Sequence, residues 1–419
     1  MREQTSMDTA RDDDLNTDIV QNEDPKIVVN SLWKVFGQNN PSQVLEDSYR
    51  DKTREEIQQE LGLVVALRNT SFKVYPGETF VVMGLSGSGK STLVRCLIRL
   101  IEATSGEVIV DGEDITTFNT DEILQFRRSK MSMVFQNFGL LPHKNVLENV
   151  AYGLEIKGVG KERRKAVALE MLERVGLTGW EHSRQRELSG GMKQRVGIAR
   201  ALAVEPSILL MDEPFSGLDP LIRRQMRLEL AELQRQIHKT IVFITHDLDE
   251  AVTVGDRIAI MRDGEIIQIG TPQEIVTRPV DDFVREFTLG VQKTKVIQAG
   301  TIARKPEIVV KDSDTLETLR SSMAVSDSAY AICVEENGLF KGLIRRETLD
   351  VIKRSEKKPL YKYFDQSVEV ISSDTILEDL LPTLIESDHP VPVIDKENRC
   401  IGVATRRDVL RVIASEVYD

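Results

Sequence analysis

The sequence predicts an α/β fold in two parts: a mainly parallel sheet covered on both faces, and a smaller α/β module made of two similar copies. Short apolar runs at 79–83, 207–211 and 240–244 alternate with longer helical stretches. That alternation is typical of parallel strands buried on both faces. An internal repeat indicates the second part, because the motif at 313–316 recurs sixty residues later at 373–376.

The composition is that of a folded protein, and it excludes some classes of function. The 419 residues are enough for two or three domains, and the net charge of -12 argues against a nucleic-acid-binding face. The three cysteines, Cys96, Cys333 and Cys400, are far apart and read as reduced thiols of a cytosolic protein. No apolar run suggests a signal peptide or a membrane span. We therefore expect any membrane role to depend on a partner.

The N-terminal region predicts an acidic tail followed by a strand and a helical insertion. Residues 1–26 are polar and acidic, which predicts disorder, and a β-branched run begins at Ile27. We expect residues 38–63 to form a helical hairpin, with Pro41 opening one helix and a capping box at Thr53 opening the next. Acids outnumber bases there, which favours a structural or partner-docking appendage over a membrane-surface helix.

The C-terminal third predicts a linker at 288–303 and two repeats, at 304–358 and 359–419. Each copy reads in the order helix, strand, hairpin, strand, helix, with Asn337-Gly338 supplying the turn of the first hairpin. Two related copies usually pack together to complete one core.

A glycine-rich loop at 84–91 is the strongest chemical motif in the chain. Gly84-Leu85-Ser86-Gly87-Ser88-Gly89-Lys90-Ser91 follows a strand and precedes a helical run, which is the context that a phosphate loop requires. Its glycines let backbone N–H groups surround phosphates at a helix N-terminus. The lysine places a charge between β- and γ-phosphates, and the final serine offers a hydroxyl to Mg²⁺. The loop predicts ATP as the ligand.

Two acids, Asp212 and Glu213, end the strand at 207–211. A carboxylate at the carboxyl end of a strand can hold Mg²⁺ through water, and the next carboxylate can orient or deprotonate the attacking water.

The segment 188–195, Leu-Ser-Gly-Gly-Met-Lys-Gln-Arg, resembles the signature of ABC ATPases. The resemblance implies that residues 27–287 form an ABC ATPase domain, a P-loop NTPase core with a helical subdomain. In that family the signature binds the γ-phosphate of ATP held by the other subunit, so the resemblance implies a homodimer. The nucleotide-binding positions that it implies are Phe36, Gly84, Ser86, Gly87, Ser88, Gly89, Lys90, Ser91, Thr92, Ser189, Gly190, Gly191 and Asp219.

The same resemblance implies a catalytic set of Glu213, His246 and Gln136, and a Mg²⁺ site at Ser91, Gln136 and Asp212. Glu213 would polarise water, and His246, after the strand at 240–244, would contact the γ-phosphate. ATP would close two subunits head to tail, and hydrolysis would reopen them. Residues 136–150 would belong to the helical arm that grips a permease.

Within the ABC family, the chain resembles the ATP-binding subunits of glycine betaine/proline betaine importers. The features that carry this resemblance are the insertion after Phe36, the C-terminal repeat, and the segments 83–90, 133–136, 189–195 and 246–251. It implies ATP-driven uptake through a membrane permease with a substrate-binding protein or domain, at the cytoplasmic side of the membrane. The alternatives are an importer for choline, carnitine or amino acids, and a non-transport ABC ATPase, which the acidic charge opposes.

The C-terminal repeat resembles a tandem CBS pair, a regulatory module that often binds adenine nucleotides. The second copy keeps the family's ribose- and phosphate-binding pattern as Gly402-Val-Ala-Thr405-Arg406-Arg-Asp408, whereas the first copy has Arg345 at the hydroxyl position. We expect Arg345, Thr405, Arg406 and Asp408 to be regulatory-ligand candidates, for a nucleotide such as a cyclic dinucleotide. The alternative is a purely structural dimerisation module.

Overall fold

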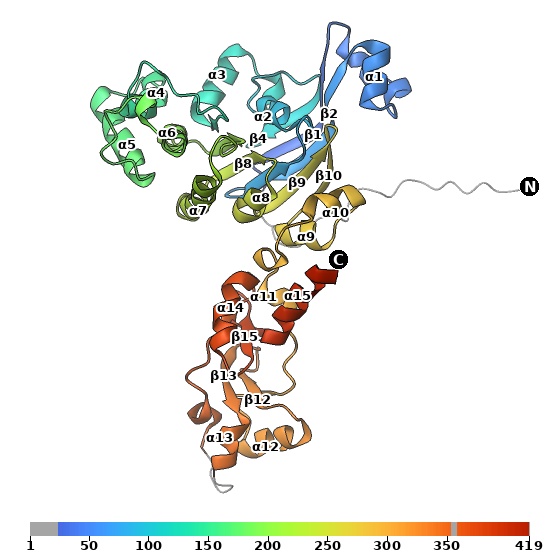
Figure 1. Cartoon of the computed structure of the whole chain (residues 1–419), viewed down its shortest axis with the longest axis vertical. Helices are drawn as coiled ribbons and strands as arrows, with labels where there is room; N and C mark the ends of the chain where they lie inside the picture. The colour runs from blue at the N-terminus through green and yellow to red at the C-terminus, as the bar shows by residue number, and fades with distance from the viewer. Residues whose placement is uncertain (1–23, 353–357, 419) are drawn as a thin grey trace, which may run out of the picture. The chain divides into compact units, whose positions relative to one another are not determined.

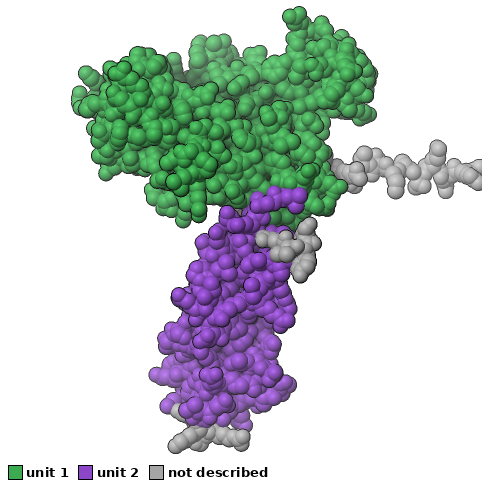
Figure 2. Space-filling view, in the orientation of Figure 1, with its two compact units in different colours: residues 1–287 green, residues 288–419 purple. Residues whose placement is uncertain are grey.

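The chain divides into two compact units, Met1–Phe287 and Thr288–Asp419 (Figure 2). The structure is a computed structural model, and it describes residues 24–352 and 358–418 (Figure 1). Most of the predicted acidic tail, residues 1–23, lies outside the described residues. Among the described helices, none is long and apolar enough to cross a membrane.

The larger sheet of the first unit has six strands in the order β10-β9-β3-β8-β7-β6. Every neighbouring pair is parallel except β9 with β10, which form an antiparallel hairpin. All residues of β3, β7 and β8 are buried, as the apolar runs predicted. The strands are β3 (Thr79–Met83), β6 (Met131–Val134), β7 (Ile208–Asp212), β8 (Thr240–Thr245), β9 (Arg257–Arg262) and β10 (Glu265–Gly270).

Two hydrophobic cores lie on opposite faces of this sheet, because successive strand residues point to opposite sides. On β3, Val81 and Met83 join the core with the later helices, and Phe80 and Val82 join the core with α2, α3 and a second sheet. The parallel α/β fold predicted from sequence is therefore confirmed. The helices around the sheet are α2 (Lys90–Leu97), α3 (Thr120–Ser129), α7 (Pro220–Ile237), α8 (Leu248–Val254), α9 (Pro272–Thr277) and α10 (Asp282–Thr288).

Three helices between β6 and β7 form a helical arm. They are α4 (Val146–Ile156), α5 (Lys161–Arg174) and α6 (Gly190–Ala203), drawn in green in Figure 1. Val150, Leu172 and Val196, one from each helix, are fully buried in their shared core. Asn145 and a glutamate at the third helical position form a capping box, which fixes where α4 begins.

The second sheet of this unit is antiparallel, in the order β2-β1-β4-β5, and packs over α2. Its strands are β1 (Ile27–Phe36), β2 (Val64–Val74), β4 (Ser105–Val110) and β5 (Glu113–Asp114). Short 3-10 turns, η3 (Ile115–Thr117) and η4 (Gln185–Glu187), occur elsewhere in the unit.

The insertion between β1 and β2 differs from the expected helical hairpin. Its first arm is a pair of 3-10 turns, η1 (Pro41–Leu45) and η2 (Asp47–Tyr49), and only the second arm, α1 (Arg54–Leu61), is an α-helix. Val44 is the one buried residue of the two turns, so this arm lacks the apolar stripe that would stabilise a longer helix. A capping box starts α1 and left-handed Gly62 ends it, as the sequence indicated.

The second unit contains two similar three-stranded sheets, β11-β12-β13 and β14-β15-β16. In each, the first pair is parallel and the second is antiparallel. Its strands are β11 (Val309–Lys311), β12 (Tyr330–Val334), β13 (Phe340–Arg345), β14 (Ile371–Ser372), β15 (Val391–Ile394) and β16 (Cys400–Ala404). Its helices and turns are η5 (Lys293–Lys295), α11 (Ala299–Ile302), α12 (Leu316–Val325), α13 (Arg346–Val351), η6 (Leu360–Tyr363), α14 (Leu377–Glu386) and α15 (Arg406–Tyr418).

The beginning of each predicted repeat packs on the other repeat. Phe364, near the start of the second repeat, lies against Gly342 of the first, where an added Cβ would be 2.5 Å from the ring. Arg304, the first residue of the first repeat, lies against Gly402 of the second, where an added Cβ would be 2.8 Å from the arginine carbonyl oxygen. The core of each repeat is thus completed by residues that the sequence assigns to the other repeat.

Residues 288–303, which we expected to be a linker, belong structurally to the second copy. The backbone N–H groups of Ala299 and Gly300 donate to the carbonyls of Thr375 and Ser373, at 2.7 and 2.9 Å. These bonds fasten α11 along the edge of the second sheet, so a boundary at 303 does not separate two structural elements.

Candidate nucleotide site

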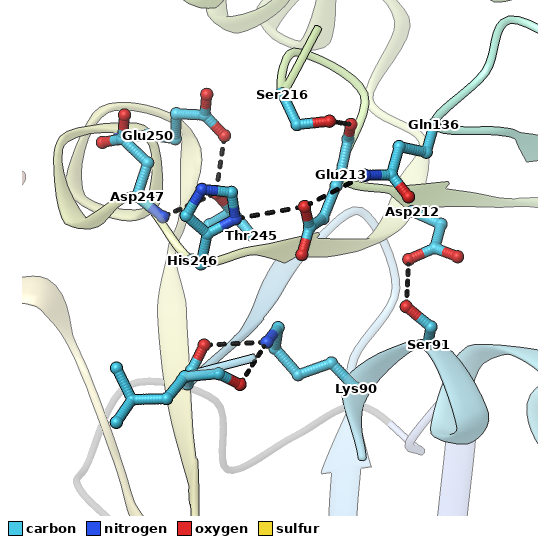
Figure 3. Close-up of polar contacts among 12 residues, drawn as sticks. Lys90, Ser91, Gln136, Asp212, Glu213, Ser216, Thr245, His246, Asp247 and Glu250 are labelled. Atoms are coloured by element: carbon cyan, nitrogen blue, oxygen red, sulfur yellow. Dashed lines mark hydrogen bonds and ion pairs between the residues drawn. The ribbon is translucent and has the colours of Figure 1, made fainter. Parts of the chain in front are cut away.

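The phosphate loop, residues 84–91, joins β3 to α2 at the carboxyl edge of the large sheet. Lys90 is only 4% exposed, and its Nζ donates to the carbonyl oxygens of Gly84 at 2.7 Å and Leu85 at 2.9 Å (Figure 3). Burial lowers the pKa of the Lys90 ammonium, and two nearby carboxylates oppose that shift. The lysine is therefore held inside the turn of the loop, next to its backbone.

Two glycines let this loop approach its neighbours closely. At Gly84 an added Cβ would lie 2.2 Å from the carbonyl oxygen of Met261, and at Gly89 it would lie 2.4 Å from that of Ala66. Gly89 also has φ +107, a conformation that residues with side chains rarely adopt. The loop is thus packed between β9 and β2, and the sequence pattern of glycines follows from these contacts.

Other predicted nucleotide contacts lie around this loop. Ser86 and Gly87 are exposed at its tip, and Thr92 lies in the first turn of α2. Phe36 ends β1 and is 40% exposed, as an aromatic ring that stacks on a base must be. Their contacts with ATP stay a prediction.

Ser91 and Asp212 form a direct pair at the base of the site. The Ser91 hydroxyl donates to Asp212 Oδ1 at 2.9 Å, and Asp212 is 4% exposed. Burial raises the pKa of the Asp212 carboxyl, and its hydrogen bond with Ser91 partly offsets that effect. A hydroxyl beside a carboxylate fits Mg²⁺, which binds through one or two carboxylates together with phosphates. Within the described residues, no group of three or more His, Cys, Asp or Glu could hold a metal.

Glu213 follows β7 in a left-handed backbone conformation, with φ +44. Two hydrogen bonds maintain it: the Glu213 N–H donates to the Ile244 carbonyl at 3.0 Å, and the Ser216 hydroxyl donates to the Glu213 carbonyl at 3.1 Å. A non-glycine residue in this region is strained, and such strain is concentrated at functional sites. The direction in which the Glu213 side chain leaves the backbone is therefore set by these backbone bonds and does not depend on the contacts of the carboxylate.

Three predicted catalytic side chains converge at this carboxylate. His246 Nδ1 lies 3.1 Å from Glu213 Oε2, and Gln136 Nε2 donates to the same oxygen at 3.5 Å (Figure 3). The three come from the ends of β6, β7 and β8, whose carboxyl ends share one edge of the sheet. The structure thus brings an amide, a carboxylate and an imidazole together beside the phosphate loop.

A buried network behind the imidazole was missed by sequence reasoning. The Thr245 hydroxyl donates to Glu250 Oε2 at 2.6 Å and accepts from the Asp247 N–H at 2.9 Å. Asp247 also lies 3.4 Å from Arg223 and 3.5 Å from Arg227 of α7. Burial raises the pKa of the Glu250 carboxyl, which is 3% exposed. These bonds fix the turn between β8 and α8 that carries the histidine.

The signature segment and Asp219 occupy the starts of two helices. The Ser189 hydroxyl caps α6 by accepting from a first-turn N–H at 3.3 Å, and Asp219 caps α7 by accepting from the Ile222 N–H at 3.1 Å. At Gly191 an added Cβ would be 2.7 Å from the Ile222 side chain, and at Gly190 3.0 Å from a neighbouring leucine. The glycines therefore let α6 approach α7 closely.

The candidate ligand residues of the second unit are engaged within the protein. Arg406 donates to the carbonyls of Leu384, Ile385 and Ser387 at 2.6, 2.7 and 2.8 Å, which ties α15 to the end of α14. Arg345 pairs with Asp365. Both guanidinium groups thus perform a structural role that the sequence did not indicate.

Asp408 is 4% exposed and is also enclosed by partners. The Thr405 hydroxyl donates to Asp408 Oδ2 at 2.6 Å, and Arg304 Nε lies 2.6 Å from Asp408 Oδ1. Because Arg304 is the first residue of the predicted first repeat, the ion pair also fastens the start of that repeat to the second one.

Comparisons with known proteins identify a family for each of two parts of the chain. The family model described as ABC transporter matches residues 67–216, and the CBS domain model matches residues 362–415. The chain is 41% identical to the glycine betaine/proline betaine transport system ATP-binding protein of Salmonella typhimurium, over 93% of this chain and 98% of that protein.

Two further similarities extend these findings. The trimethylamine N-oxide transport system ATP-binding protein of Pelagibacter ubique is 45% identical over 80% of this chain and 99% of its own length. A dimeric ATP-binding cassette solved in a post-hydrolysis state, bound to ADP and Pi, is similar in structure at a TM-score of 0.50 and 32% identity. That likeness covers 59% of this chain and 98% of the cassette.

Proposed function

The chain belongs to the ABC transporter family, and from that premise we propose that it is the ATP-hydrolysing subunit of an importer for glycine betaine-type solutes. The observation that carries the ATPase activity is the convergence of Gln136, Glu213 and His246 beside Lys90. The solute class rests on the similarity to betaine-transport subunits over nearly their whole length.

The phosphate loop binds the nucleotide, with Lys90 between the β- and γ-phosphates and Phe36 stacked on the adenine. Ser91, Asp212 and Gln136 would hold Mg²⁺, which neutralises charge on the phosphate oxygens. The Ser91–Asp212 hydrogen bond of 2.9 Å supports this assignment, because it places the hydroxyl and carboxylate oxygens side by side at the phosphate loop.

Glu213 acts as the general base for hydrolysis. Its carboxylate takes a proton from water while the water oxygen bonds to the γ-phosphorus and the bond to the β–γ bridging oxygen breaks. The electron pair of the broken phosphorus–oxygen bond leaves with ADP, and the products are ADP and phosphate. His246 and Lys90 stabilise charge on the transferring group. The distance of 3.1 Å between His246 and Glu213 supports a shared position around the attacking water.

Two copies of the chain form the working enzyme. The Ser189 cap and Gly190 and Gly191 present the N-terminus of α6, a place that favours a phosphate, to ATP held by the other copy. Asp219, the N-cap residue of α7, would lie between the two nucleotide sites of the dimer. The similarity to a dimeric cassette bound to ADP and Pi supports this arrangement.

A groove between the large sheet and the helical arm would receive the permease, which would hold this chain on the cytoplasmic face of the membrane. Arg200 supports its wall by donating to the carbonyls of Gly139 and Phe138 at 2.6 and 3.0 Å. Gln136 lies in the adjoining segment and also contacts Glu213. A displacement of the segment that lines the groove would therefore shift Gln136 and change its contact with the catalytic carboxylate. The exposed apolar side chains at this groove include Phe135 and Ile156.

The CBS pair regulates hydrolysis. Because the second unit is compact by itself, removing residues 288–419 should leave basal ATPase activity and abolish its response to ionic strength or adenine nucleotides. An unchanged response would refute this role and favour a purely structural module.

Transport in reconstituted vesicles tests the function directly. With its permease and substrate-binding partner present, radiolabelled glycine betaine should enter only when ATP is supplied, and Glu213→Gln should stop it. ATP hydrolysis without movement of any betaine-type solute would refute the solute assignment. Trimethylamine N-oxide is the second candidate, because a relative named for its transport is 45% identical; competition between the two solutes separates them.

A further inference from the structure

The insertion helix α1 has no role in the ATPase chemistry described so far, yet its first residue lies at the phosphate loop. The Thr53 capping box fixes the start of α1, and Ile57, fully buried, anchors the helix in a small core on β1 and β2. Arg54 is the first residue of the helix and is consequently held in a defined place. Its side chain is only 18% exposed.

Arg54 reaches three separate segments. Its guanidinium donates to the carbonyl of Ala66 at 2.9 Å and to that of Gly87, in the phosphate loop, at 3.3 Å. It also lies 3.7 Å from the carboxylate of Asp263, in the β9–β10 turn. Asp263 is 72% exposed, so solvent screens its charge and the positive charge of Arg54 is only partly neutralised.

The Arg54 partners are themselves in contact with the loop. The Ala66 carbonyl oxygen lies where a Cβ on Gly89 would come within 2.4 Å of it. Gly264 leaves space for the guanidinium, because an added Cβ there would be 2.4 Å from Arg54 Nη2. Arg54 therefore fills the gap between the insertion, β2 and the hairpin turn, directly behind the glycines that surround the phosphates.

A second set of bonds ties the same hairpin turn to the loop without Arg54. The Gly264 N–H donates to the Ser88 carbonyl at 2.9 Å, and the buried Thr70 hydroxyl donates to the Gly264 carbonyl at 2.8 Å. The turn is thus held even when the arginine is changed. Arg54 adds a hydrogen bond to the carbonyl of Gly87 in the loop and a positive charge.

We propose that Arg54 is a positioning residue for ATP: it holds the phosphate loop in its binding shape through the Gly87 and Ala66 carbonyls, and its charge strengthens binding of the triphosphate. The peptide unit of the Gly87 carbonyl carries the N–H of Ser88, which donates to the Leu85 carbonyl at 3.2 Å. A carbonyl that accepts from a cation polarises its peptide unit, so the Arg54 bond strengthens this hydrogen bond within the loop. The insertion is then part of the nucleotide site. This inference rests on the proposed ATPase function.

The test is ATP affinity in the full chain with Arg54 replaced. Arg54→Ala should raise the Kd for a fluorescent ATP analogue and the KM for ATP about tenfold, with kcat changed less than threefold. Arg54→Lys, which keeps the charge and one donor nitrogen but loses the planar fork, should restore affinity to within about threefold of the original protein. Arg50→Ala is the matched control: this arginine belongs to the same insertion, is 77% exposed and, among the described residues, pairs with exposed Asp47.

The outcomes separate this inference from the proposed function. If the original chain binds and hydrolyses ATP but Arg54→Ala has a KM within twofold of Arg50→Ala, the positioning role is refuted. A lowered melting temperature with unchanged Kd would likewise show a purely structural arginine. If Arg54→Ala does not fold, an unchanged Kd in Arg54→Gln, which keeps the length but loses the charge, overturns the electrostatic part. Absence of ATP binding in the original chain would instead refute the ATPase assignment.

Discussion

Replacing Glu213 by glutamine tests the chemistry of the site most directly. The amide keeps the size of the carboxylate, and its oxygen can still accept from Gln136, now 3.5 Å away. The strained backbone of the residue is held by bonds to Ile244 and Ser216, which the change leaves in place. The change removes the negative charge of the carboxylate and, with it, the ability to accept a proton.

The expected magnitude follows from this loss. A positioned general base contributes about 10²–10⁴-fold in rate, which corresponds to about 3–5 kcal/mol of activation free energy. We expect kcat to fall by that factor, the Kd for ATP to stay within about threefold, and the free energy of unfolding to change by about 0.5 kcal/mol or less.

Phosphate release, nucleotide binding and thermal melting measured on the same preparations provide the assay. Glu122→Gln is the matched control, because Glu122 closes the capping box of α3 and glutamine fills that position equally well. A decrease of less than tenfold in kcat for Glu213→Gln, or an equal decrease in the control, would refute the assignment of Glu213 as the base.

Three further predictions concern stability. Burial raises the pKa of Glu250 above its ordinary 4.5, so the stability linked to this carboxyl is present below that value and is lost as pH rises through the folded-state pKa. Glu250→Gln should therefore raise the melting temperature more at pH 8 than at pH 5, and an equal change at both would contradict this. Ile57→Ala, at a fully buried site, should destabilise the insertion by about 2–4 kcal/mol, seen as faster hydrogen exchange at 54–61. Leu360 is in the second predicted repeat but packs in the core of the first, so Leu360→Ala should increase hydrogen exchange in β12 and β13. Faster hydrogen exchange confined to the second repeat would contradict this packing.

The sequence was sufficient to predict the sheet, and it identified the residues that converge at the site. Apolar runs that end in Asp212 and Glu213 or precede His246 determine which side chains meet, because parallel strands end at one edge. Thr245 and Glu250 could have been found from their spacing across the start of α8, where Asp247 is an N-cap residue.

Other features depend on contacts that no local pattern contains. Arg54 is separated from Gly87 by the rest of α1 and by two strands, β2 and β3, so its bond to the phosphate loop exists only after β1 and β2 pair. Arg406 was expected to face a ligand because it lies in a ligand-binding pattern, but its guanidinium satisfies carbonyls at the end of α14. The left-handed backbone of Glu213 arises from neighbouring strands and has no signature of its own.

Because each repeat of the second unit packs on residues of the other, the two repeats form a single thermodynamic system. Leu360 lies in the core of the first copy, and Ile332 and Leu343 of the first copy share a core with Val403 of the second. Separating the copies in the chain would remove part of the core of each. A change that stabilises one repeat should therefore slow the opening of both, so the two repeats would unfold with one shared midpoint even if a ligand bound only one of them.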